Sequence, residues 1–248
     1  NLRVEPVDIN KSIDYFNPDG DTIWYAMSGV KSVGTGFVHA IMRERDANGP
    51  FKSFPDFVLR VPAEAMNSRM VEALIKVGAF DRLHPSRKAL LQILPELMEA
   101  AQRVQAEKAS AQSSLFEGFS DRASGADIHD IHIPKVTEWD AKMRGAFEKE
   151  FLGFFLREHP LDKFRTEIDS FGGTRSGQIA GLLEDLQGED SRDIAMIGLI
   201  TEIQLRNDKS GRAWAFVKLE DYEGSFGVKF FARSYETAKD VLEVDRVI

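Results

Sequence analysis

Apolar residues recur at helical spacing in the first hundred positions and at every second position near the end of the chain. Phe37, Val38, Ile41 and Met42 fall on one stripe, which predicts a helix with Thr35 as its N-cap and its end near 48–50. A short strand is expected over 22–27. The turn between the two, GVKSVGTG over 29–36, is rich in glycine.

A second helical unit follows. Ser53 and Asn67 are the expected caps of two helices, and Gly78 the expected end of the second. Ser86 caps a longer helix that Pro95 is expected to kink. Further helices are predicted over 139–156 and 176–186. Residues 109–136, rich in Ser, Ala, Gly and Asp, predict a mobile linker.

From Asp193 the apolar period changes to two. We predict three antiparallel strands with turns at 209–211 and 223–224, a helix over 235–242, and a strand that begins at Val247. This is the element order of an OB-fold β-barrel. The expected fold is therefore multi-domain α+β, with a barrel truncated at its fourth strand. The start without Met also leads us to expect a piece of a longer chain.

Composition narrows the classes of protein. The 248 residues are 43% hydrophobic and 29% charged, as in soluble globular proteins. No apolar run approaches the roughly 20 residues of a membrane span, so no membrane partner is expected. The absence of cysteine excludes disulfides, thiolate nucleophiles and Cys-based zinc sites, and a cytoplasmic location is expected.

Charge is distributed unevenly. The net charge of −8 argues against binding to nucleic acid, because affinity for phosphate comes from Lys and Arg. Residues 51–92, however, carry seven basic side chains against four acidic ones. A local basic face on an acidic protein is therefore possible.

The glycine-rich turn is the first candidate site. Glycines let a backbone approach a ligand closely, and amides at the start of a helix suit an anion. The expected contacts are Lys31, Ser32, Gly34, Thr35 and Gly36. The pattern resembles a helix-hairpin-helix element, which holds a DNA backbone without reading sequence. Such binding requires that the amides of Gly34 and Gly36 face outward. The alternative is a turn whose glycines serve only the packing of the chain.

The stretch IKVGAFD resembles a degenerate copy of the same element, with Lys76 as the cation and Gly78 as the close-approach glycine. It lies within the region of basic excess. Two copies in tandem are more specific than one. We therefore expect a tandem helix-hairpin-helix domain that binds duplex DNA.

The second predicted strand of the barrel alternates clearly. Ala213, Ala215, Val217 and Leu219 suit the interior, and Trp214, Phe216 and Lys218 the outside. Aromatic rings beside cations stack bases and hold phosphates of single strands. Alternatively, the two rings pack against another domain. The candidate single-strand site comprises Arg206, Lys209, Arg212, Trp214, Phe216 and Lys229.

Catalytic and metal signals are weak. His129 and His132 have a spacing that suits a metal, but the chain has no cysteine and they fall in the predicted linker. No Ser/His/Asp arrangement or paired carboxylate is recognisable. We therefore expect no catalytic residue and no metal site in this sequence.

The predicted linker contains an unexpected apolar segment, AQSSLFEGF over 111–119. Gln112, Leu115 and Phe116 resemble the short peptide by which bacterial replication proteins bind the sliding clamp. The amide suits hydrogen bonds at a pocket rim and the two apolar side chains suit its interior. A local turn with Leu115 folded onto the domain is the alternative.

The order of these parts, with the strings EKEFLGFFLREHPLD and FVKLED, is similar to the C-terminal part of bacterial DNA polymerase III alpha subunits. The resemblance runs along nearly the whole chain. Ser32 departs from it, since the family usually has glycine there. By resemblance, residues 1–22 end a fingers domain, 23–108 form the tandem hairpin domain, 109–136 the linker, 137–190 a helical connector and 193–248 the partial OB-fold.

The resemblance implies a parent DNA-directed DNA polymerase that extends a primer with Mg²⁺, its catalytic carboxylates lying upstream. Duplex DNA, the single-stranded template, the sliding clamp and other replicase subunits would be the partners. Two alternatives stay open. One is a non-catalytic helix-hairpin-helix plus OB module of a repair or recombination protein, and the other is a nucleotide-binding enzyme that uses the glycine-rich turn.

Overall fold

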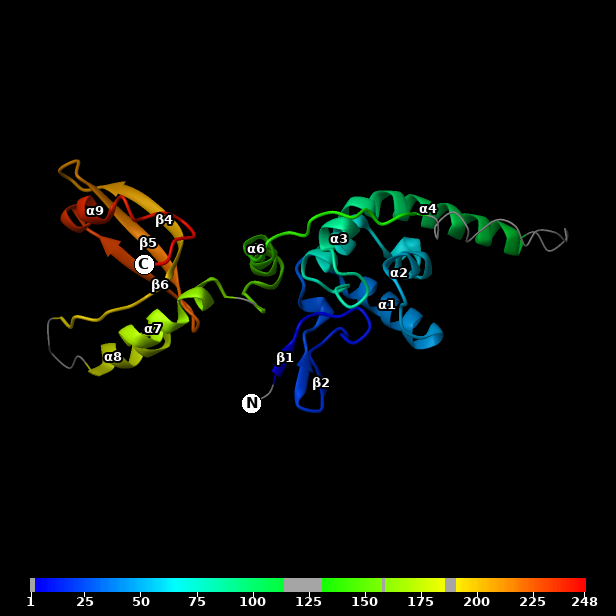
Figure 1. Cartoon of the computed structure of the whole chain (residues 1–248), viewed down its shortest axis with the longest axis horizontal. Coiled ribbons are helices and arrows are strands. Elements are labelled where there is room, and N and C mark those ends of the chain that lie inside the picture. Colours follow the sequence, from blue (N-terminus) through cyan, green and yellow to red (C-terminus); the bar gives the residue numbers. More distant parts are fainter. Residues whose placement is uncertain (1–2, 114–130, 158, 186–190) are drawn as a thin grey trace. The chain divides into compact units, whose positions relative to one another are not determined.

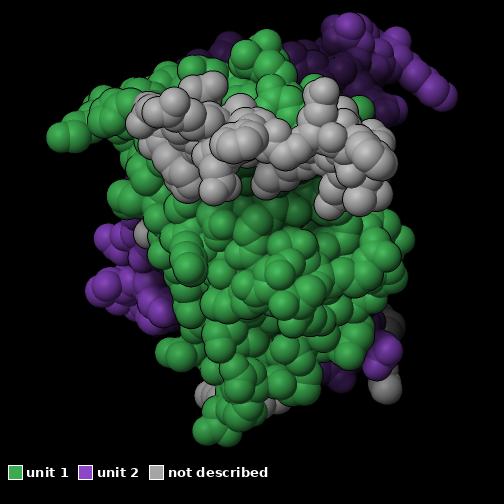
Figure 2. Space-filling view, turned by 90° about the vertical axis from the view of Figure 1, so that its right-hand side faces the viewer, with its two compact units in different colours: residues 1–157 green, residues 158–248 purple. Residues whose placement is uncertain are grey.

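The computed structural model describes residues 3–113, 131–157, 159–185 and 191–248, and the side chains of 108–113 lie outside this description. The chain divides into two compact units, unit 1 over 1–157 and unit 2 over 158–248 (Figures 1 and 2). The predicted boundaries at 108, 136 and 190 stay predictions. Residues 131–157, which the sequence assigned to the linker and connector, belong to unit 1.

Unit 1 begins with a small sheet of three short strands. β1 (Arg3–Glu5) pairs in parallel with β3 (Thr22–Trp24), and β2 (Asn17–Asp19) pairs with β3 in the antiparallel sense. The 3-10 helix η1 (Met27–Gly29) and a tight turn then lead into α1 (Thr35–Asn48). The predicted strand and helix are both confirmed, but the N-cap of α1 is Gly34 and not Thr35.

The next helices begin where their capping residues indicate. α2 (Phe54–Arg60) is capped by Ser53, whose hydroxyl accepts from the Asp56 amide, and α3 (Ser68–Lys76) by Asn67. The 3-10 helix η2 (Ala63–Ala65) lies between them. Ser86 accepts from the Ala89 amide at the start of α4 (Arg87–Ser113), and Pro95 lies inside this helix.

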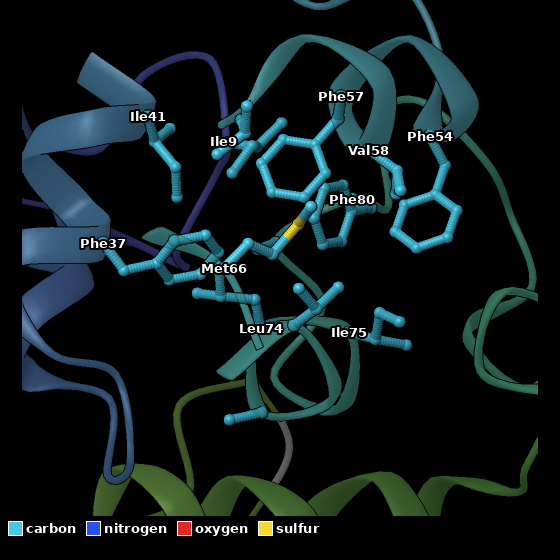
Figure 3. Packing of buried hydrophobic residues seen from close by; sticks show 14 of the residues in the cluster. Ile9, Phe37, Ile41, Phe54, Phe57, Val58, Met66, Leu74, Ile75 and Phe80 are labelled. Atoms are coloured by element: carbon cyan, nitrogen blue, oxygen red, sulfur yellow. The ribbon is translucent and has the colours of Figure 1, made fainter. Parts of the chain in front are cut away.

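Later in unit 1, α6 (Ala141–Leu152) is shorter than the predicted helix over 139–156, because Asp140 caps its start and Gly153, with a φ of 90°, ends it. α6 packs on α3. The common core is built around phenylalanines: Figure 3 shows Phe37 and Ile41 of α1 facing Phe54, Phe57 and Phe80. This core is what fixes the hairpin that precedes α1.

Unit 2 begins with short helices: η3 (Pro160–Phe164), α7 (Arg165–Phe171), η4 (Ser176–Gln178) and α8 (Ile179–Asp185). The buried Asp221 carboxylate fixes η4, because it accepts from both the amide and the hydroxyl of Ser176 at 2.6 Å. Burial alone would raise the pKa of Asp221, but these two bonds and those from the amides of Glu223 and Gly224 together lower it.

An antiparallel sheet in the order β4-β5-β6 forms the rest of unit 2: β4 (Leu199–Asn207), β5 (Ala213–Glu220) and β6 (Ser225–Phe230), followed by α9 (Ala232–Ala238). The first strand starts six residues later than the sequence predicted. Residues 245–248 run antiparallel to the start of β4, with the Gly198 amide donating to the Ile248 carbonyl at 2.9 Å.

The alternation predicted for β5 is largely confirmed. Ala215, Val217 and Leu219 are buried and form the small core of the sheet, whereas Ala213 is exposed. The described residues of unit 2 form an open three-stranded sheet with one short additional pairing, not a closed barrel. The α+β class is confirmed at this level. Within the described residues, no helix has the length and apolar character needed to cross a membrane.

Candidate nucleic-acid interface

The glycine-rich turn of unit 1 forms a tight hairpin before α1. The Val33 amide donates to the Val30 carbonyl at 3.0 Å, and Gly34 then caps the helix with an extended backbone. Ser32 has a φ of 73°, the left-handed conformation that normally favours glycine. The hairpin therefore has a glycine-like backbone although serine occupies the position.

The amides at the start of α1 make no hydrogen bond within the described residues. Within the described residues, those of Gly34, Thr35 and Gly36 have no hydrogen-bond acceptor, and no side chain caps the helix. All three residues are exposed. Adjacent free amides, at the positive end of a helix dipole, form an anion-binding arrangement. Unbonded amides at Gly34 and Gly36 are what duplex binding would require, and the binding itself stays a prediction.

α6 supports the hairpin from the other side. The Lys31 amide donates to the carbonyl of Phe151 at 2.8 Å, so this amide is not available to a ligand. An open hollow of about 420 Å³ lies between residues 28–33 of the hairpin and 150–153 at the end of α6. Lys31 is exposed and is one of the residues that line this hollow. The hairpin is thus held by a helix more than a hundred positions later in the chain.

The outer face of the unit 2 sheet carries the other candidate site. The register places Arg206 opposite Trp214, and Phe216 opposite Lys229. Both rings are half-buried and both cations are exposed. In the adjoining loop, Arg212 pairs with Asp208 at 2.9 Å, and Lys209 is exposed. All six predicted single-strand residues thus lie on this face or in its loop with a solvent-exposed or half-buried side chain, and Arg212 is in addition paired with a carboxylate.

Comparison with known proteins bears on both sites. A family model described as a helix-hairpin-helix motif matches residues 1–90, which contain the hairpin and its free amides. Over its whole length the chain is 34% identical to the DNA polymerase III subunit alpha of Saccharopolyspora erythraea, and covers 21% of that protein. The corresponding proteins of Borreliella burgdorferi (31%) and Pseudomonas aeruginosa (32%) also match all of the chain, which covers 21% and 22% of them.

The chain belongs to the DNA polymerase III alpha subunit family. It spans about a fifth of the length of the curated relatives it matches. The resemblance drawn from the sequence is therefore confirmed. None of these comparisons assigns a role to an individual residue, so the site residues stay predictions that geometry alone supports or weakens.

The second hairpin of this family member differs from the first. Gly78 is buried, and its amide donates to the Ile75 carbonyl at 2.9 Å at the C-terminal end of α3. Lys76 is half-buried, with its ammonium 5.3 Å from the ring centroids of Phe147 and Phe151. That these two residues bind a duplex stays a prediction, and the structure gives both of them a packing role.

Around this second hairpin lies an ionic network that the sequence did not reveal. The buried Arg87 guanidinium donates to both oxygens of Asp81, at 2.9 and 2.8 Å, and Arg157 pairs with the same carboxylate. Glu148 of α6, also buried, accepts from the amides of Leu156 and Arg157. Burial is the main cause that raises the pKa of both carboxyl groups.

The start of α4 is occupied by a carboxylate of the same chain. Glu138 accepts from the Lys88 amide at 3.4 Å and from its neighbour Trp139 at 2.7 Å. Burial alone would raise the pKa of Glu138, but hydrogen bonds from Trp139, Ser86, Lys88 and Arg87 lower it overall. This helix start, unlike that of α1, is therefore already satisfied by an anion.

Two further predictions fall outside the description. Leu115 and Phe116 of the clamp-binding peptide lie outside the described residues, as does the side chain of Gln112. His129 lies there too. Among the described residues, no group of three or more His, Cys, Asp or Glu side chains is arranged to hold a metal ion.

Proposed function

We propose that this chain is the region of a bacterial replicative DNA polymerase that holds the duplex through the hairpin before α1. The single observation that carries the proposal is the row of free amides at Gly34, Thr35 and Gly36. Such a row binds a backbone phosphate in any sequence context, as a replicative polymerase requires. It also explains how a protein with a net charge of −8 could bind DNA, because backbone dipoles act locally.

The matched family model and the relatives support this assignment. The relatives are named DNA polymerase III subunit alpha, so the parent activity we propose is primer extension by a DNA-directed DNA polymerase. Its Mg²⁺ and the carboxylates that bind it would lie outside the part of the family that this chain matches, as the resemblance implies. A repair or recombination module has no comparable support among these relatives.

Unit 2 is proposed to be an OB-type domain for single-stranded DNA. The pairing of residues 245–248 with the start of β4 supports this, because it places a fourth chain segment beside the first strand of the sheet. The peptide at Gln112, Leu115 and Phe116 is proposed to bind the sliding clamp. Other replicase subunits are the remaining proposed partners, and the cytoplasm the proposed location.

The hairpin assignment can be tested by filling its anion site from within. Gly34 has ordinary backbone angles, and a Cβ built on it meets nothing within 4 Å. Gly34→Asp therefore places a carboxylate where it can accept from the free amides, which stabilises α1 by about 1 kcal/mol. The same carboxylate excludes and repels a phosphate. We expect higher thermal stability together with loss of duplex affinity, measured by fluorescence anisotropy at several salt concentrations.

Two controls separate capping from charge. Gly34→Ser caps the helix without a charge and should weaken duplex binding less. Gly181→Asp adds the same charge at an exposed glycine of unit 2, where a Cβ also meets nothing, and should leave binding nearly unchanged. Duplex affinity that survives Gly34→Asp, or that does not fall with salt in the parent chain, would contradict the proposal.

A further inference from the structure

On the outer face of the unit 2 sheet, the Phe216 ring occupies space that only a glycine leaves open. A Cβ built on Gly227 of the neighbouring strand would lie 2.5 Å from Cζ and 2.7 Å from Cε2 of that ring. The ring therefore lies across β6 and close against its backbone. A ring placed in this way keeps its other face toward solvent, in agreement with its half-buried state.

A second pair of rings extends this surface. Trp214 and Phe231 have centroids 6.2 Å apart and planes inclined by 30°, so their faces point in similar directions. Phe231 is 64% exposed although it is a large aromatic residue, and it lies between β6 and α9, where the sequence alternation did not identify it. Three aromatic side chains thus lie on one side of the sheet or at its border.

The charges on this face are arranged by position along the strands. Arg206 and Lys229 lie opposite Trp214 and Phe216, at the end of the face that carries the rings. Glu202 and Glu220 lie toward the other end, where Lys218 and Ser225 are their cross-strand partners. The aromatic end is therefore the one that suits a strand of phosphates, and a basic or purely apolar partner would fit it poorly.

We propose that Phe216, Trp214 and Phe231 form a stacking surface for consecutive bases of single-stranded DNA, with Gly227 as the residue that positions the Phe216 ring. This inference rests on the proposed function of unit 2 and adds the positions of the bases. Stacking tolerates any base, whereas Arg206 and Lys229 supply contacts to phosphate. Gly227 itself touches no base and acts through the ring above it.

The test compares oligo-dT with an abasic oligonucleotide of equal length and equal charge, bound to the whole chain. Stacking predicts that oligo-dT binds at least tenfold more tightly, and that Phe231→Ala or Phe216→Ala removes most of this preference. Gly227→Ala should act like Phe216→Ala, because the new methyl group displaces the ring. Since the clash falls on the far end of a side chain, folding stability should change little.

Gly181→Ala provides the matched control, since its Cβ meets nothing within 4 Å in the same unit. A second readout is ¹⁹F NMR of protein labelled with 5-fluorotryptophan, which gives one signal for each of the three tryptophans. Oligo-dT should shift the Trp214 signal, assigned through Trp214→Phe, and the abasic strand should not.

Equal affinity for the two oligonucleotides, or an unshifted Trp214 signal at saturation, would overturn the stacking surface and indicate that these rings pack against protein. Failure of the proposed function of unit 2 gives a different result. In that case neither oligonucleotide would show salt-dependent binding to the chain. Salt-dependent binding of both oligonucleotides with equal affinity would therefore contradict the stacking surface alone.

Discussion

The guanidinium group of Arg87 occupies the space that Gly78 leaves empty. A Cβ built on Gly78 would lie 2.4 Å from Nη2 of Arg87 and 2.7 Å from Oδ2 of Asp81. The same arginine donates to the Lys76 carbonyl at 2.8 Å. The glycine is thus needed so that a buried ion pair can close over the end of α3, which gives it a packing role.

Gly78→Ala should therefore unfold unit 1 readily. Its φ of 83° disfavours alanine by roughly 1–2 kcal/mol, and the clash with two charged groups adds to this, so we expect a loss of about 3 kcal/mol or more. Urea denaturation measures it. Gly20→Ala is a matched control, because Gly20 has a φ of 61° but open space around its Cβ, and should show the backbone cost alone. A stable Gly78→Ala protein that had lost only duplex affinity would instead favour a DNA-contacting glycine.

Ser32 should show the opposite behaviour on replacement by glycine. Serine in the left-handed region is strained by roughly 1–2 kcal/mol, and the extra chain entropy of glycine in the unfolded state offsets part of the gain. We expect Ser32→Gly to raise stability by about 0.5–1 kcal/mol in thermal unfolding, with duplex affinity equal or higher. Ser32→Val should lower both, since β-branched residues tolerate this conformation poorly. A less stable glycine variant would mean that the serine side chain contributes a contact of its own.

Local signals were predictable from the sequence and distant contacts were not. The caps at Ser53, Asn67 and Ser86 are confirmed because a cap depends on residues only a few positions apart. The same reasoning could not distinguish the free glycine of the first hairpin from Gly78 of the second. That difference is set by Arg87, together with Asp81 and Arg157, and no local pattern encodes it.

The site on the unit 2 sheet shows the same limit. Alternation along β5 correctly placed Trp214 and Phe216 away from the core. It could not find Phe231, which lies beyond the strands and joins the surface only through the path of the chain into α9. The burial of Glu148 was likewise not predictable from a local pattern, because its amide partners follow the end of α6 at Gly153.

Glu148→Ala should destabilise the segment that follows α6. The change leaves the amides of Leu156 and Arg157 without their acceptor, which costs about 1–3 kcal/mol for buried groups. Hydrogen exchange at these two amides should accelerate together with the fall in stability. Glu150→Ala, at an exposed position two residues further along the same helix, should change stability by no more than about 0.5 kcal/mol. Equal effects of the two changes would show that the carboxylate of Glu148 has no special role.

Glu138→Gln should reveal a pH-dependent contribution at the start of α4. The folded state lowers the pKa of Glu138 below its ordinary value near 4.5, so the carboxylate stabilises the fold above that value. This contribution is lost as the pH falls through the folded-state pKa. At pH 7 we expect the glutamine variant to be less stable by roughly 0.5–1 kcal/mol, the size of a charge effect at a helix start. At pH values below both pKa values the two proteins should have the same stability in urea denaturation.

The control is Glu96→Gln on the exposed face of α4. Its stability should equal that of the parent at every pH, so no convergence is expected. A constant difference between Glu138→Gln and the parent at every pH would mean that shape, not charge, matters at this position.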